Sequence, residues 1–278
     1  MDTMSLTEIA RSTLAIVDAG GYVAPSGARR ELRADVDGSL AGTRLYTPAE
    51  LEALIAAPSA PAPRGAPRIE VTTETTAAAA RRLASEGASV CALNFASAKN
   101  PGGGFVRGAK AQEEDVCRVS ALYPCLLTQR AYYDENRACG TMLYTDHLIY
   151  SPAVPFFRDD RYDLLETPYR CSVITSPAPN AGEELRRDPD AQPAISRTLV
   201  RRTAMVLAVA AAHRERNLVL GAWGCGVFRN DPAEVAAVFA DALAAPRFAG
   251  AFDRIVHAVW SRTDDDPNLI AFRRRFAA

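Results

Sequence analysis

The sequence of 278 residues contains few of the residues from which metal and cofactor sites are built. Its three histidines, His147, His213 and His257, stand far apart, and its six cysteines form no Cys-x-x-Cys pair. A zinc site made of these residue types is therefore not expected. The pattern Gly-x-x-x-x-Gly-Lys-Ser/Thr and the pattern Gly-x-Gly-x-x-Gly are also absent. Their absence argues against ATP or nicotinamide dinucleotide chemistry.

The chain also lacks an excess of charge and any long apolar run. With 32 basic and 33 acidic residues its net charge is -1, so no general field attracts nucleic acid or an anionic membrane, and a polyanion must be bound locally. Residues 1–20 carry Asp and Glu and lack the apolar core of a secretory signal, and no window is apolar enough to span a membrane. We expect a cytoplasmic protein with reduced thiols.

The N-terminal region is predicted to be helical and set apart from the rest. A loosely amphipathic helix is expected over 7–17, and a second one begins after Thr47, where Thr, Pro and an early Glu form a good helix start. Segment 58–67, PSAPAPRGAP, is too rich in proline for a regular element. We therefore predict an N-terminal accessory region with its linker over 1–67 and a main domain over 68–278.

The main domain alternates predicted strands with predicted helices. Short runs rich in β-branched residues predict strands over 69–74, 89–96, 147–157, 171–179, 217–223 and 253–260. Apolar residues at helical spacing predict helices over 76–87, 112–126, 195–215, 231–245 and 266–276. This order predicts an α/β fold in which a mixed, largely parallel sheet is covered on both faces, as a three-layer α/β/α domain with an N-terminal helical extension.

Two glycine-rich loops follow predicted strands, 100–104 (NPGGG) and 221–232 (GAWGCGVFRNDP). Loops at the carboxyl ends of parallel strands meet at one edge of the sheet, and free N–H groups ahead of a helix can bind a diphosphate. The alternative for either loop is a tight turn. Phe228 then either covers a ribose or fills the core beneath the loop. Cys225 is either a reactive thiol or a small residue that allows close approach of the backbone, and we favour the second because no base is evident for the first.

The acidic triplet Glu113, Glu114 and Asp115 also has two interpretations. It can be an ordinary acidic helix start, favoured by the helix dipole. Alternatively, a carboxylate that is partly desolvated beside a bound diphosphate is favoured in its protonated form, which a general acid requires. Because neighbouring helical residues point about 100° apart, we expect one glutamate to be the acid and the other a positioning group.

These motifs together resemble a known family. The stretches NFASAKNPGGGFVRGAKAQEEDVCR, SPAVPFFRDD, ITSPAPNAG and LVLGAWGCGVFRNDP are similar to those of the bacterial-type poly(ADP-ribose) glycohydrolases, whose signature is a GGG loop followed by QEE. The resemblance runs from about residue 69 to residue 259, and the N-terminal region looks like the family's accessory extension. It implies a macro domain in which ADP-ribose lies across the edge of the sheet, and a glycosidase that needs neither metal nor cofactor.

The resemblance also implies roles for individual residues. Glu114 takes the catalytic position, Glu113 holds ribose hydroxyls, and Gln112 steadies the loop. Phe228 lies against the ribose, and Asn100 contacts the distal ribose. The glycines of the catalytic loop and the residues around the diphosphate are Gly102, Gly103, Gly104, Gly224, Cys225, Gly226 and Val227.

The favoured function is hydrolysis of poly(ADP-ribose), mainly from chain ends, with release of ADP-ribose. A non-catalytic ADP-ribose reader would keep both glycine loops but would not need the paired acids. A hydrolase of mono-ADP-ribosylated protein would use the same fold, usually without this GGG-to-QEE arrangement. The expected partners are thus poly(ADP-ribose) or an ADP-ribosylated protein, without a membrane or general nucleic-acid binding, and we expect a monomer.

Overall fold

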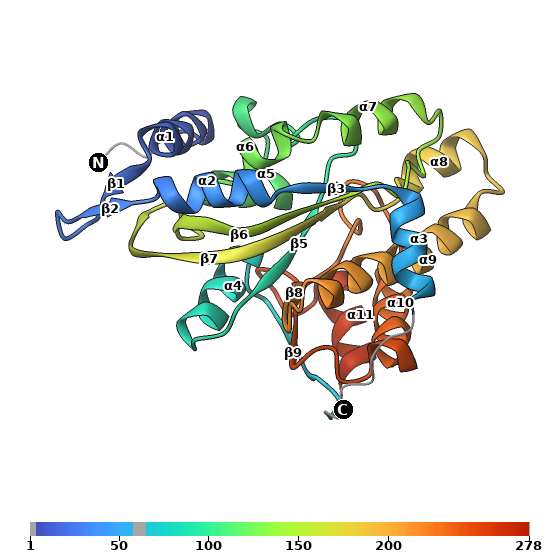
Figure 1. The fold of residues 1–278 in the computed structure, drawn as a ribbon. Helices are drawn as coiled ribbons and strands as arrows, with labels where there is room; N and C mark the ends of the chain where they lie inside the picture. The colour runs from blue at the N-terminus through green and yellow to red at the C-terminus, as the bar shows by residue number, and fades with distance from the viewer. Residues whose placement is uncertain (1–3, 58–64, 278) are drawn as a thin grey trace.

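The computed structural model describes residues 4–57 and 65–277 (Figure 1). A seven-stranded sheet with the strand order β3-β6-β7-β5-β8-β9-β4 forms the centre, and β1 and β2 form a small separate sheet. In chain order the strands are β1 Gly21–Val23, β2 Arg29–Glu31, β3 Arg44–Tyr46, β4 Arg68–Thr72, β5 Cys91–Phe95, β6 Leu148–Arg158, β7 Leu164–Ser176, β8 Asn217–Leu220 and β9 Arg254–Ala258.

The central sheet is mixed and largely parallel, which confirms the prediction. The strands from β7 through β5, β8 and β9 to β4 pair in parallel, whereas β3 with β6 and β6 with β7 pair antiparallel. The long β6–β7 hairpin lies beneath α2 in Figure 1.

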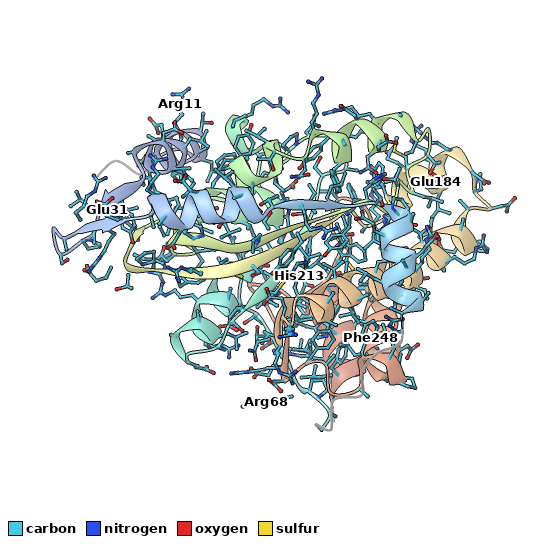
Figure 2. All side chains as sticks on the ribbon, viewed as in Figure 1. Arg11, Glu31, Arg68, Glu184, His213 and Phe248 are labelled. Atoms are coloured by element: carbon cyan, nitrogen blue, oxygen red, sulfur yellow. The ribbon has the colours of Figure 1, made fainter. Side chains whose placement is uncertain are left out.

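Helices cover both faces of the sheet, as expected for three layers. The helices are α1 Leu6–Ala19, α2 Arg33–Gly42, α3 Pro48–Ala56, α4 Thr76–Ser85, α5 Gln112–Val119, α6 Leu122–Leu127, α7 Arg130–Ala138, α8 Ala181–Arg187, α9 Gln192–Ala212, α10 Pro232–Ala244 and α11 Pro267–Phe276, with short 3-10 helices η1 Phe105–Arg107 and η2 Pro246–Phe248. Alternate residues of one strand serve opposite layers: Ala92 belongs to the core under α4 and α5, while Cys91 and Leu93 belong to the core against α9 and α10. Side chains fill both layers (Figure 2).

The helix predicted over 112–126 is interrupted. Ser120 has an extended backbone and forms a bridge to Phe156 of β6, so that α5 ends at Val119 and α6 begins at Leu122. The N–H of Ala121 donates to the carbonyl of Pro155 at 3.0 Å. Pairing with β6 thus replaces helical hydrogen bonds here, a contact between distant segments that helical composition does not reveal.

The N-terminal region takes part in the same architecture. Its strand β3 pairs with β6 at the edge of the sheet. Helix α1 lies against α5, where the hydroxyl of Thr13 donates to the carbonyl of Arg118 at 2.6 Å. Residues 58–64 of the predicted linker lie outside the described residues, and the division into 1–67 and 68–278 stays a prediction. Within the part of the chain that the structure describes, no helix combines the length and the apolar character needed to cross a membrane.

Candidate active site

The two glycine-rich loops meet at one edge of the sheet. Strands β5 and β8 are parallel neighbours, with Ala92 opposite Val219, and each loop leaves the carboxyl end of its strand. A cavity of about 1050 Å³ lies at this edge and is lined by parts of both loops and by the start of α5. This is the place and the size expected for the ligand site of an open α/β sheet.

The cavity brings together most of the residues predicted for the site. Its lining includes Asn100, Gly103, Gly104, Gln112, Glu113, Glu114, Gly224, Gly226, Val227 and Phe228. Two predicted residues are outside that lining. Gly102 is buried against Tyr123 and Cys117, and Cys225 lines a separate, smaller cavity.

The first loop requires glycine because it lies tightly against α5. Gly102 and Gly103 both have left-handed backbones, with φ of 62° and 57°. A Cβ atom at Gly102 would come within 2.7 Å of the Tyr123 ring, and one at Gly103 would collide with the carboxyl of Glu114. Side chains are therefore excluded both by backbone conformation and by space.

Glu114 is fixed by the loop that it faces. Its side chain lines the cavity although the residue is only 8% exposed, and its Oε1 accepts a hydrogen bond of 2.9 Å from the N–H of Gly104. The loop and the carboxyl thus determine each other's position. One carboxyl oxygen is oriented by the backbone, as a proton-transfer group needs.

Glu113 has different partners and a more enclosed position. The residue is 3% exposed, and its carboxyl accepts hydrogen bonds from the N–H of Ser97 at 2.8 Å and from Nδ2 of Asn94 at 3.1 Å. Burial raises the pKa of Glu113 to about 8 in spite of these two hydrogen bonds, which lower it. Burial thus favours the protonated form of Glu113. The adjacent glutamates therefore occupy two distinct environments.

Gln112 connects the start of α5 to the end of β5. Its Oε1 accepts a hydrogen bond from the N–H of Phe95 at 2.8 Å, and its Nε2 donates to the carbonyl of Leu93 at 2.8 Å and to Thr76 at 3.1 Å. Both amide atoms thus bind protein groups. Since β5 leads directly into the glycine loop, this side chain fixes the point from which the loop departs.

The side chain of Asn230 anchors the second loop. The side-chain Nδ2 of Asn230 donates to the carbonyl of Pro179 at 2.8 Å and to that of Gly224 at 3.0 Å. Gly224 has φ of 73°, and a Cβ atom there would come within 2.5 Å of the same amide. A Cβ atom at Gly226 would meet nothing within 4 Å, and Val227 is 82% exposed. This tip can therefore receive a ligand without rearrangement.

The surroundings of Cys225 and Phe228 bear on how these two side chains of the loop are interpreted. Burial raises the pKa of the Cys225 thiol to about 12, so it is not a thiolate nucleophile at neutral pH. Phe228 lines the cavity, and it also packs on the core and lies 6.0 Å from the Tyr144 ring, measured between centroids. The two interpretations of Phe228 are thus compatible, since one ring reaches both the core and the cavity.

Several residues at the cavity were not predicted. Asn94 and Ser97 hold Glu113, and Tyr144 and Trp260 line the cavity wall. Asn94 could have been noticed as a polar residue within a predicted buried strand, and Ser97 as the residue that follows this strand. Tyr144 and Trp260 carry no such signal. In residues 4–57 and 65–277, no three His, Cys, Asp or Glu side chains are grouped so that they could hold a metal ion.

The family model and the solved structures that match this chain point to the same family. The family model described as the catalytic domain of microbial-type PARG matches residues 10–159, more than half of the chain. A crystal structure of poly(ADP-ribose) glycohydrolase from Thermomonospora curvata is 48% identical, with a TM-score of 0.92, and the match covers 98% of this chain and 99% of that one. The same T. curvata enzyme bound to the inhibitor ADP-HPD matches with 48% identity over 98% and 99% of the two chains and a TM-score of 0.89.

A second organism provides a similar structure with a ligand. The poly(ADP-ribose) glycohydrolase of Deinococcus radiodurans in complex with ADP-ribose is 48% identical to this chain, with a TM-score of 0.81. The match covers 87% of this chain and 96% of that one. Among curated proteins, none matches.

Proposed function

The chain belongs to the family of microbial-type poly(ADP-ribose) glycohydrolases, and from this premise we propose that it hydrolyses ribose–ribose bonds of poly(ADP-ribose), mainly from chain ends, and releases ADP-ribose. The observation that carries the proposal is the position of Glu114, whose carboxyl is fixed by the Gly104 N–H in a cavity between two glycine loops. The fold is proposed to be that of a macro domain.

ADP-ribose fills the cavity in this proposal. Its diphosphate lies at the tip of the second loop, near Gly226 and Val227, where space is open and the backbone can approach an anion. Phe228 lies against the ribose that follows. The first loop covers the glycosidic bond, and Asn100 contacts the distal ribose. Related enzymes have been crystallised with ADP-ribose and with the inhibitor ADP-HPD, which supports this choice of ligand.

Glu114 performs the proton transfers. As the glycosidic bond breaks, the departing oxygen takes the proton of the Glu114 carboxyl, and the sugar passes through a cation resembling an oxocarbenium ion. The neighbouring diphosphate places negative charge beside that cation and lowers its energy. Ionised Glu114 then accepts a proton from the water that attacks the anomeric carbon. One carboxyl acts twice in this proposal because Glu113 and Glu114 both stand in the first turn of α5 and not on opposite sides of the bond.

Glu113 holds ribose hydroxyls. Burial favours the protonated form of this carboxyl, and a protonated carboxyl can both donate to and accept from a hydroxyl group.

Substrate specificity tests the proposal. Purified protein is incubated without metal with poly(ADP-ribose) and, in parallel, with a mono-ADP-ribosylated protein, and the products are separated by chromatography. Release of ADP-ribose from the polymer, with the mono-modified protein left intact, supports the proposal. Release only from the mono-modified protein would favour the mono-ADP-ribosyl hydrolase, and binding without release from either would favour a reader.

A further inference from the structure

The segment between α7 and β6 forms part of the cavity wall and is anchored at successive residues. The N–H of Met142 donates to Oε2 of Glu184 at 2.7 Å, and Glu184 lies on α8, where Figure 2 labels it. The N–H of Thr145 donates to Oδ1 of Asn136 at 2.8 Å. Between these anchors stands Tyr144, which lines the cavity. The segment is therefore a fixed wall.

Tyr144 has an unusual backbone for its residue type. Its φ is 61°, in the left-handed region that bulky residues rarely adopt, because Cβ crowds the following carbonyl. Such strain persists only where surrounding contacts impose it, and it concentrates at ligand sites.

A buried arginine holds the Tyr144 segment. Arg202 of α9 is 0% exposed, and its Nη2 donates to the carbonyls of Leu143 at 2.9 Å and of Tyr144 at 3.4 Å. Its Nη1 donates to the carbonyl of Pro177 at 2.6 Å, next to Ala178 of the cavity wall.

The charge of Arg202 is balanced within the same segment. Oδ1 of Asp146 accepts from Nε of Arg202 at 3.1 Å and from Nη2 at 3.0 Å, and Asp146 also pairs with Arg201. One guanidinium thus connects α9 to two stretches of the cavity wall. Its planar set of donors suits this task better than a lysine would.

The ring of Tyr144 lies beside that of Phe228. Their centroids are 6.0 Å apart and their planes differ by 46°, and both residues line the cavity. On the proposed function, on which this step rests, Phe228 lies against the ribose next to the diphosphate. We propose that Tyr144 is a second substrate-binding residue that encloses this ribose together with Phe228, and that Arg202 positions it. Aromatic faces offer a sugar a rigid apolar surface with little loss of side-chain entropy.

Replacing Tyr144 by glycine tests the role of the ring without adding backbone strain. Glycine adopts positive φ readily, so Tyr144→Gly removes the ring without straining the fold. We expect its Kd for ADP-ribose, measured by calorimetry, to rise by about tenfold, the size of one aromatic contact. Tyr144→Phe retains the ring and should bind like the wild type. The matched control is Arg214→Gly, at another exposed position with positive φ, 59°, which is outside the cavity lining, and it should leave Kd unchanged.

The outcomes separate this inference from the proposed function. If the wild type binds ADP-ribose and Tyr144→Gly binds it equally well, this inference alone is overturned. If the wild type does not bind ADP-ribose, the proposed function is overturned as well.

A double-mutant cycle tests the role of Arg202. If this side chain acts through Tyr144, Arg202→Lys should weaken ADP-ribose binding and raise KM in the wild-type background but have no further effect in Tyr144→Gly. Thermal unfolding of each variant verifies that binding is compared between folded proteins. Equal losses of affinity in both backgrounds would overturn the positioning role.

Discussion

The backbone N–H of Gly104 donates a hydrogen bond of 2.9 Å to Oε1 of Glu114. This bond joins the glycine loop to the first turn of α5, so that the loop and the proposed acid form one unit. A change in either should therefore lower the rate of the chemical step more than it weakens ligand binding.

Gly103→Ala should separate binding from catalysis. A Cβ atom there collides with the Glu114 carboxyl, and the left-handed backbone is unfavourable for alanine. We expect kcat on poly(ADP-ribose) to fall by about a hundredfold, because small misplacements of a reacting group have large effects, while Kd for ADP-ribose changes far less. Gly87→Ala is the control, since Gly87 also has positive φ but open space around it. Equal kcat values for the two variants would contradict the account.

Gly226→Val should weaken binding without destabilising the protein. No atom lies within 4 Å of a Cβ at Gly226, so the added side chain fits the unliganded protein but occupies the space proposed for the diphosphate. Calorimetry should show a Kd for ADP-ribose that is raised by at least about tenfold, as expected when a closely approaching backbone is blocked. Gly65→Val, at another open glycine, should bind normally. Unchanged affinity in Gly226→Val would remove the second loop from the site.

Glu113 should make stability fall as pH rises. Burial raises its folded-state pKa to about 8 from 4.5, so between these values the folded state retains a proton that the unfolded state has lost. The free energy of unfolding then decreases with pH across this window, by about 3 kcal/mol at pH 7 relative to acidic pH. Denaturant unfolding of the wild type and of Glu113→Gln at several pH values measures this, and parallel pH profiles would show that Glu113 is ionised in the folded protein.

His257 should make the free energy of unfolding fall as pH decreases, the opposite of the effect of Glu113. Both its ring nitrogens are buried without a hydrogen-bond partner among the described residues, and the ring stacks on Phe276 at 4.2 Å. Burial lowers its pKa to about 3 from 6.5. Below pH 6.5 the imidazole is therefore protonated in the unfolded state but not in the folded state. This difference reduces the free energy of unfolding at pH 5 by about 2 kcal/mol relative to neutral pH.

The variant His257→Phe isolates this effect. It retains an aromatic ring in an apolar site and cannot be protonated, so its stability should decline less than that of the wild type between pH 7 and pH 5. An identical decline in both proteins would mean that His257 is not the group responsible.

Local signals predicted the features that depend on neighbouring residues. Thr47 caps α3 with Glu50 as expected, and Asp231 caps α10, because capping involves residues only a few positions apart. The meeting of the two glycine loops was also predictable, since it follows from parallel neighbouring strands. The break at Ser120 was not, because it results from pairing with β6.

In the site, too, features set by residues close in sequence were predictable, and features set by contacts between distant residues were not. The position of Glu114 on the first turn of α5 followed from the motif, but the different environments of Glu113 and Glu114 depend on Asn94 and Ser97, which precede them by more than a dozen residues. Tyr144 is held by Arg202 from a helix far along the chain. No local pattern marks such a contact.

The most direct test of the central claim compares the wild type with Glu114→Gln in single-turnover cleavage of poly(ADP-ribose), together with the Kd of each for ADP-ribose. The amide retains the shape of the side chain but has no proton to transfer as an acid. We expect an unchanged Kd and a rate lowered by at least about a hundredfold, because general acid–base catalysis is lost. Cleavage by Glu114→Gln at a rate close to that of the wild type would contradict the claim.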